Sequence, residues 1–359
     1  MKVYFICHPL GTPDKAAYQH QVVVLAEGLK ELGIEFWGNI NYWLQSEMEG
    51  DYLIRQKEGV NLNDFDLVVF ASQLFDYDRL DLLPENIFDR NREFTSIFLD
   101  CSDFLITPGY DKRMRAVDYV LKSQYNQKYT HPSNFVPWQF GPSSRIINSA
   151  QPLPFEQRNN CTVSNFRILH NLRAHFDKNV MPLVYEHYPE NSGIPAFDAD
   201  ASMPEDYIFW QQTGRRHNPA YYRALGANKV VNAVSGYAQK EILTKQNQIV
   251  RIVTKVEEKL NILPYDRVYQ FDSWRFWESL VSGSLTMHVD FDKFGIKLPV
   301  MPQNKEHYLG VDLNNVNGIR DVLESEDAVT NIAASGREWV LKHYSPKATT
   351  ERLLQMLDA

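Results

Sequence analysis

The sequence predicts an α/β protein built from two doubly wound parallel sheets. Short apolar runs alternate with amphipathic helical patterns along most of the chain, which is typical of parallel strands covered by helices. With 359 residues, the chain is longer than one hydrophobic core usually serves. A stretch rich in Pro, Gly, Ser and Asn, from 134 to 154, is the best candidate for a linker. We therefore expect a first unit over residues 1–145, a second over 155–340, and a terminal segment over 341–359.

The first unit contains apolar runs that predict parallel strands buried on both faces. Between the first two runs, apolar residues recur at helical spacing from Tyr18 to Leu32, and Gly33 ends this predicted helix. The ligand site of such a sheet lies beyond the carboxyl ends of its strands. The predicted strands are Lys2–Cys7, Ile34–Trp37, Asp66–Ala71, Ser96–Asp100 and Tyr119–Leu121.

The second unit repeats this alternation. Its last part is a short helix after Gln270, a stop at Gly283 and an apolar strand that ends at Asp290. Near the end of the chain, Ser345 and Pro346 predict a break between two helices, because Ser caps a new helix and Pro suits its first position. The other predicted elements are strands over Phe166–His170 and Lys229–Val234, and helices over Arg173–Tyr188 and Ile249–Leu260.

Composition and charge argue against several classes of protein. The formal charge of -8 and the pI near 5.7 speak against a protein that coats nucleic acid, because phosphate binding needs a clustered basic surface. Three scattered cysteines are too few for a disulfide framework or a metal knuckle. No apolar run reaches the roughly 20 residues that span a bilayer, and the first strand is too short for a signal sequence. We therefore expect a soluble, cytoplasmic protein.

The segment from Gln270 to Asp290 carries the strongest functional signal. Arg275 and Glu278 lie about one helical turn apart, so they share a helix face. A carboxylate can accept two hydroxyls of a ribose, and the planar guanidinium of an arginine can bind a diphosphate. Ser273, at the start of the helix, joins this candidate donor-binding set. The alternative is an ordinary helix–strand unit with a surface Arg and Glu.

Further arginines lie where the second unit can bind an anion. Arg167 and Arg173 follow a predicted strand that feeds a helix, whose free backbone N–H groups and positive dipole attract negative charge. Arg215 lies in a second basic turn, for which a solvated loop is an equal alternative. The first unit lacks the Gly-x-Gly-x-x-Gly turn of dinucleotide-binding proteins and the spacing of a P-loop. Redox and kinase functions therefore lose most of their support.

Acid–base candidates lie in the first unit. Asp100 and Asp103 follow a predicted strand, so we expect them to face the ligand site, where a carboxylate can deprotonate an acceptor hydroxyl. Helix capping is the alternative role for Asp103. His8 and His20 are further acid–base candidates, although a lone histidine more often has a structural role.

The core from Arg275 to Glu278 resembles the donor site of GT-B glycosyltransferases, in particular the phage DNA beta-glucosyltransferases and family-4-like or CgeB-like glycosyltransferases. This resemblance implies two Rossmann-like domains that face a cleft, with a UDP- or GDP-sugar held by the second domain. It implies that Arg275 binds phosphate, that Glu278 binds ribose and that the helix in 341–359 crosses back to the first domain. It also implies that Asp100 acts as the catalytic base, because an Asp after a similar strand does so in the phage enzymes.

The resemblance also bears on mechanism and on metals. Many retaining GT-B enzymes carry a second Glu eight residues before the ribose-binding one, and here Gln270 holds that place, which favours inversion. Four Asp-x-Asp pairs match the metal-binding pattern of another transferase class, but a pattern this frequent in an acidic chain is a weak signal. Arginines and a helix N-terminus can neutralise the leaving diphosphate. We therefore expect no metal site and no cofactor besides the nucleotide sugar.

The expected function is that of a hexosyltransferase-type glycosyltransferase. It would move a sugar from a nucleotide-diphosphosugar to a hydroxyl of a carbohydrate, a lipid-linked acceptor or a small molecule. One alternative is a DNA-modifying glucosyltransferase, against which the net charge speaks, so nucleic acid is not an expected partner. Another is a binding protein that kept the fold without catalysis. The sugar, the nucleotide, the acceptor, the oligomeric state and the role of Pro302–Tyr308 stay open at this stage.

Overall fold

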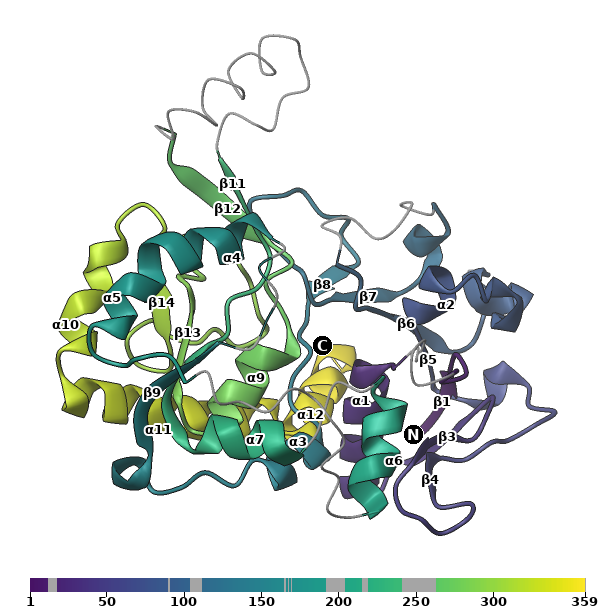
Figure 1. The fold of residues 1–359 in the computed structure, drawn as a ribbon. Coiled ribbons are helices and arrows are strands. Elements are labelled where there is room, and N and C mark those ends of the chain that lie inside the picture. Colours follow the sequence, from purple (N-terminus) through teal and green to yellow (C-terminus); the bar gives the residue numbers. More distant parts are fainter. Residues whose placement is uncertain are drawn as a thin grey trace.

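The computed structural model describes residues 1–11, 18–89, 91–103, 112–164, 166, 168, 170–191, 204–214, 219–240 and 263–358. Two parallel sheets, each flanked by helices, lie side by side, as Figure 1 shows. The predicted α/β class with doubly wound parallel sheets is therefore confirmed.

The first sheet contains six strands in the order β2-β1-β5-β6-β7-β8, and every neighbouring pair is parallel. Its central strands are buried on both faces, which explains their continuous apolar runs. The strands predicted for the first unit are confirmed within a residue or two. The bounds are β1 Lys2–Ile6, β2 Glu35–Gly38, β5 Leu67–Ala71, β6 Thr95–Asp100, β7 Tyr119–Lys122 and β8 Phe135–Pro137; the flanking helices are α1 His20–Glu31 and α2 Gln73–Asp76.

The second sheet contains four parallel strands in the order β14-β13-β10-β9. Its first strand is β9, Asn159–Ser164, whereas the described residues of the strand that we predicted over Phe166–His170, namely Phe166, Ile168 and His170, lie in bends and not in a strand. Because β9 lies at the sheet edge and exposes its first residues, it needs few apolar side chains, and the sequence signal is weak. The remaining strands are β10 Asn228–Asn232, β13 Leu285–Val289 and β14 Leu309–Val311.

The segment 134–154 is more ordered than a linker. It contains β8, the edge strand of the first sheet, and the helix α3, Ser144–Ser149. The side chain of Ser143 accepts a hydrogen bond from Ile146 N and so caps this helix. Pro and Gly mark turns, but they do not exclude short elements between the turns.

The helix predicted from Arg173 to Tyr188 is divided into three pieces. They are α4 (Asn171–His175), a π-helical segment (Phe176–Val180) and α5 (Met181–Tyr185). Pro182 lacks the N–H that a continuous helix needs, which accounts for the irregularity beside it. The helix predicted over 249–260 lies outside the described residues.

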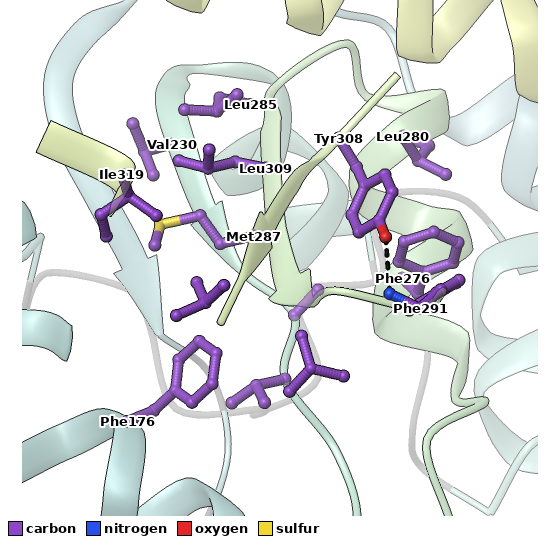
Figure 2. Packing of buried hydrophobic residues seen from close by; sticks show 14 of the residues in the cluster. Phe176, Val230, Phe276, Leu280, Leu285, Met287, Phe291, Tyr308, Leu309 and Ile319 are labelled. Atoms are coloured by element: carbon purple, nitrogen blue, oxygen red, sulfur yellow. Dashed lines mark hydrogen bonds between the residues drawn. The ribbon is translucent and has the colours of Figure 1, made fainter. Parts of the chain in front are cut away.

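The helix α9, Trp274–Val281, packs its apolar face between β13 and the long helix α11, Glu326–Tyr344. Phe276 and Leu280 are buried in the core of the second sheet, where Figure 2 shows them beside β13 and β14. Its N-terminus lies at the carboxyl end of the sheet, and its C-terminus lies near the amino end. This orientation aims the start of α9 at the ligand side.

The stretch Pro302–Tyr308 has a structural role in this core. The Asn304 side chain bonds both Gly310 N (2.7 Å) and Gly310 O (3.0 Å), which anchors the loop to β14. Phe291 N donates to the buried Tyr308 hydroxyl at 2.8 Å, the bond that is dashed in Figure 2. These contacts join β14 to the turn after β13.

The end of the chain returns to the first sheet. After α11, Ser345 caps the helix α12, Pro346–Leu357, as the Ser-Pro pair predicts. In Figure 1, α12 lies against α1. Gly28 of α1 permits this contact, because a Cβ there would overlap the Pro346 carbonyl, and the Thr350 hydroxyl donates to Leu25 O at 3.3 Å.

A second crossing comes from the helix α6, Pro204–Gln212, which belongs to the second unit by sequence but packs on the first. The Gln212 side chain bonds both the N and the O of Leu44 (2.8 and 2.9 Å). The unit boundaries at 145 and 155 therefore stay a prediction. The remaining elements are the hairpin strands β3 Tyr42–Leu44 and β4 Tyr52–Ile54, the hairpin strands β11 Tyr237–Lys240 and β12 Tyr265–Tyr269, and the helices α7 Pro219–Gly226 and α10 Arg320–Leu323.

Candidate functional site

A cavity of about 720 Å³ lies between the carboxyl ends of the two sheets. The first unit lines it with residues that follow β5, β6 and β8, and the second with residues from α4, from the end of β10 and from the start of α9. This is the place where doubly wound sheets bind ligands. We call it the cleft. Its lining includes Tyr18, Gln73, Asp76, Ser102, Asp103, Phe140, His170, Arg173, Ser235, Gln270, Asp272, Ser273, Trp274 and Arg275.

The second unit contributes positive charge to the cleft. Arg275 lies in the first turn of α9, and Arg173 lies in α4, where its guanidinium donates to Val234 O and Ser235 Oγ, both at 3.4 Å. Burial, followed by the charge of Arg275, lowers the pKa of Arg173 to about 10. Two cations held near each other make this wall a favourable place for an anion.

The first turn of α9 adds backbone donors to this wall. Ser273 holds the N-cap position, yet its side chain makes no capping bond, and its buried hydroxyl has no hydrogen-bond partner among the residues that the structure describes. Uncapped N–H groups at a helix N-terminus attract negative charge. Ser273 and Arg275 thus lie together in the cleft, and their expected role in donor binding stays a prediction.

Glu278 lies elsewhere. It is buried at 3% exposure and does not line the cleft. The Tyr221 hydroxyl donates to its Oε2 at 3.1 Å, and the Tyr222 hydroxyl donates to its Oε1 at 3.4 Å. Burial and the charge of Glu278 raise the pKa of both tyrosines well above the usual value. The expected binding of ribose by Glu278 stays a prediction. In this structure the hydroxyls of Tyr221 and Tyr222 bond both oxygens of its carboxylate.

Asp100, the expected base, is buried and also does not line the cleft. Its carboxylate forms an ion pair with Lys122 Nζ at 2.8 Å, and both side chains are fully buried. Ser102 donates to the same carboxylate from its backbone N (3.1 Å) and from its hydroxyl. Asp100 does not line the cleft, so its geometry favours a structural role over proton transfer, and its assignment as the base stays untested.

Two other carboxylates of the first unit do line the cleft. Asp103 follows β6, and Asp76 ends the short helix after β5. Asp76 keeps contact with solvent, yet the loss of hydration, followed by the charges of Asp100 and Asp103, raises its pKa to about 6. The sequence analysis missed Asp76 as a site residue. Its position after an apolar strand, like that of Asp103, is the signal that could have identified it.

His20 supports the cleft without lining it. The residue is buried at 1% exposure at the start of α1, its Nε2 lies 2.7 Å from Gly141 O, and its Nδ1 lies 2.9 Å from the Tyr18 hydroxyl. Tyr18 lines the cleft and stacks on Trp274, with ring centroids 6.0 Å apart. The structure therefore places His20 behind the aromatic wall, where it can orient Tyr18. A catalytic role for His20 stays a prediction.

The backbone is strained where β12 leads into α9. Gln270, which lines the cleft, has a φ of 55°, a conformation that is costly for a residue with a side chain. The backbone at Tyr269 and Gln270 passes close to Gly236, where a Cβ would overlap the Tyr269 carbonyl. This tight crossing directs Gln270 into the cleft and brings the start of α9 beside the end of β10.

Two predicted site residues, Arg167 and Arg215, lie outside the described residues. Within the ranges that the structure describes, no three His, Cys, Asp or Glu side chains are grouped as metal ligands would be. In the same ranges, no helix combines the length and the apolar character that a membrane crossing requires.

The whole chain aligns with solved glycosyltransferase structures. An alpha-glucosyltransferase in complex with UDP and a 13-mer DNA that contains a central A:G mismatch matches 100% of this chain and 99% of its own, with a TM-score of 0.54 and 9% sequence identity. The chain has the GT-B fold. The motif from Arg275 to Glu278 resembles that of the phage DNA beta-glucosyltransferases, whereas this solved neighbour is an alpha-glucosyltransferase.

Two further GT-B structures agree with this assignment. The alpha-glucosyltransferase in complex with UDP alone has a TM-score of 0.51 and 9% identity, covering 100% of this chain and 99% of that one. A glycosyltransferase from Rickettsia africae ESF-5 has a TM-score of 0.50 and 9% identity, covering 99% and 97%. At these identities the likeness defines the fold. No family model and no curated protein sequence matches the chain.

Proposed function

We propose that this protein is a glycosyltransferase that moves a sugar from a nucleotide-diphosphosugar to a hydroxyl acceptor. The observation that carries this proposal is the division of charge in the cleft. Arginines from the second unit line one wall, together with Asp272, whose pKa burial raises to about 8, and the carboxylates Asp76 and Asp103 from the first unit line the other. A GT-B neighbour crystallised with UDP supports a donor of this class.

On the donor side, the diphosphate would lie against Arg275 and Arg173, with the Ser273 hydroxyl and the first N–H groups of α9 as further donors. Charge-assisted hydrogen bonds to a planar guanidinium suit phosphate oxygens. Glu278 would bind ribose hydroxyls only in exchange for its bonds to Tyr221 and Tyr222. Loss of nucleotide affinity in a Glu278→Gln variant that keeps its stability would support that exchange.

On the acceptor side, Asp76 would act as the general base, with Asp103 as the nearest alternative. The carboxylate takes the proton of the acceptor hydroxyl while the oxygen attacks the anomeric carbon. The bond from that carbon to the diphosphate breaks, and the leaving diphosphate keeps the electron pair next to the arginines. A base with a pKa of about 6 is deprotonated at neutral pH and still accepts a proton readily.

We infer inversion from this arrangement, because base and donor cations lie on opposite walls of one cleft. The solved GT-B neighbours named alpha-glucosyltransferases keep retention as the alternative. Proton NMR of the first product formed from a nucleotide α-sugar distinguishes the two, since a β-linked product requires inversion. An α-linked product would remove the role of Asp76 as the base for direct displacement.

The direct test is transfer itself. The protein is incubated with UDP- and GDP-sugars, first in thermal-shift screening and then with a panel of hydroxyl acceptors, and nucleotide release is measured. A matching donor raises the melting temperature by mass action. Activity that survives EDTA would support metal-independent transfer. Donor binding without hydrolysis or transfer to any acceptor would favour the non-catalytic binding protein.

A second candidate is transfer to DNA. The observation in its favour is that a GT-B neighbour was solved with a DNA duplex in place. The formal charge of -8 alone does not support excluding nucleic acid as a partner. Affinity for duplex DNA that falls steeply with salt, together with transfer to hydroxymethylated DNA, would select this candidate.

A further inference from the structure

A second cavity, of about 550 Å³, lies at the opposite end of the second sheet from the cleft. Arg158, which directly precedes β9, and Gly283, which precedes β13, place it at the amino ends of the strands. The middle of α11 forms its other wall, with Arg337 and Leu341. It shares no lining residue with the cleft.

The charge of this cavity is unbalanced. Arg158, Arg337 and Lys342 line it against one carboxylate, that of Glu338. In the part of the chain that the structure describes, neither Arg158 nor Arg337 belongs to an ion pair. Arg158 is buried at 8% exposure, and burial, followed by the charge of Arg337, lowers its pKa to about 10. Arg337 is half-buried, and holding a second cation beside the buried Arg158 is costly unless an anion compensates them.

The two guanidinium groups are held in fixed positions by carbonyls at the end of α9 and in the turn that follows it. Arg158 Nη1 donates to Gly283 O at 2.6 Å, and Arg337 Nε donates to Val281 O at 3.0 Å. Gly283 has a φ of 63°, and a Cβ there would lie 3.1 Å from both Arg158 Nη2 and Arg337 Cδ. The missing side chain therefore keeps open the space beside the two arginines. Arg158 Nε also donates to Leu153 O at 2.9 Å, and its Nη1 donates to Ser284 Oγ at 3.3 Å. Nη2 of Arg158 and both terminal nitrogens of Arg337 remain as further N–H donors in the described part of the chain.

Part of the remaining wall is apolar. The Phe155 ring lies 5.2 Å from the Arg158 guanidinium, and Leu341 and Ala334 continue the surface along α11. Fixed guanidinium donors beside an aromatic and an aliphatic wall match a ligand with an anionic group and an apolar body. Paired guanidinium groups favour phosphate, which can accept from both.

We propose that this cavity is a second anion site that binds a phosphate monoester of a small organic molecule, independently of the transfer proposed for the cleft. Phenyl phosphate is the probe, and calorimetry measures its affinity. Inorganic phosphate and phenol, titrated separately, measure the contribution of the anionic group and of the ring. Binding of phenyl phosphate should be tighter than that of either part, because the cavity offers both surfaces.

The decisive variant is Ala334→Glu, which adds a carboxylate to the cavity wall and keeps both arginines as partners of α9. It should weaken phenyl phosphate binding at least about tenfold, because the added carboxylate repels the phosphate and competes with it for the charge-assisted hydrogen bonds of the arginines. Arg337→Gln should act in the same direction. The control is Lys347→Gln, which removes one exposed charge from α12 and should bind as the wild type does. Arg275→Gln, which removes a charge from the cleft, separates binding in this cavity from binding in the cleft.

Two outcomes would overturn the proposal. If Arg275→Gln abolishes binding and Ala334→Glu leaves it unchanged, the anion occupies the cleft. If the wild type shows no saturable binding of phenyl phosphate, the two arginines serve only to hold the carbonyls of Val281 and Gly283.

Discussion

At the scale of single residues, burial separates the carboxylates that follow the strands of the first sheet. Asp100 is fully buried and paired with Lys122, whereas Asp76 and Asp103 line the cleft. A carboxylate that is neutralised by a buried lysine is poorly placed to collect a proton from an acceptor. A residue that directly follows a strand is therefore correctly expected at the ligand end of the sheet. That position does not show whether its side chain lines the cleft or is buried.

Asp76→Asn should lower the transfer rate by about 10²–10⁴-fold and leave nucleotide affinity unchanged, because an amide cannot accept the proton. The pKa of Asp76, raised to about 6, gives a matching pH dependence: the wild-type rate should fall as the pH drops below about 6 and the base becomes protonated. Nucleotide release measured between pH 4.5 and 8 tests both effects. Near-normal turnover of Asp76→Asn would place the base elsewhere, first at Asp103.

Asp100→Asn should act mainly on stability. It leaves Lys122 buried without its counter-charge, which typically costs about 3–5 kcal/mol of unfolding free energy. The double variant Asp100→Leu/Lys122→Met should regain much of that loss in urea unfolding, because no unpaired charge stays buried. If Asp100→Asn keeps its stability and loses turnover, the assignment that the sequence predicted for Asp100 is correct.

At the scale of elements, α9 joins the two ends of the second sheet. Its start, with Ser273 and Arg275, lies in the cleft, whereas its last carbonyl bonds Arg337 and the carbonyl of Gly283, in the turn that follows, bonds Arg158 at the second cavity. The sequence predicted this helix and its glycine stop, because the apolar spacing and the positive φ at Gly283 are local properties. The neighbours of Glu278 could not be predicted, since Tyr221 and Tyr222 come from a distant helix.

Arg275→Gln should weaken UDP binding by roughly ten- to a hundredfold, since it removes a charge-assisted contact of about 1.5–3 kcal/mol from the cleft. The melting temperature without ligand should stay near that of the wild type. Lys347→Gln, an exposed single-charge change on α12, is the matched control. Equal UDP affinity in the wild type and both variants, measured by calorimetry, would contradict the assignment of Arg275 to the binding of the donor diphosphate.

At the scale of the whole molecule, side-chain bonds to the backbone join the two units. Gln124 accepts from Asp272 N at 3.0 Å and donates to Asp272 O at 2.9 Å, and Asn126 donates to Val268 O at 2.8 Å. The Asp272 carboxylate accepts from Trp277 Nε1 (2.6 Å) and from Phe140 N (2.7 Å). Together with the contact of α12 on α1, these bonds keep the two walls of the cleft together.

Stability should depend on pH through Asp272. Burial raises its pKa to about 8, above the usual value of 3.8, so the folded state binds more protons than the unfolded state between these values. The contribution of Asp272 to the free energy of unfolding is complete below about pH 4 and is lost as the pH rises towards 8. Urea unfolding at pH 5 and pH 8 should show this decrease, and Asp272→Asn should reduce it. An identical pH dependence in the variant would refute the assignment.

The alternation of strands and helices, the strand ends that form the ligand side, and the helix that starts with Ser273 and Arg275 followed from the sequence alone. These features depend on periodicity and capping, which act over a few residues. The tertiary structure decided the rest. It buried Asp100 against Lys122, enclosed Glu278 between two tyrosines and exposed Asp76 to the cleft. Burial and pairing depend on residues far apart in the chain, and so the chemistry of a carboxylate is set by its neighbours in space.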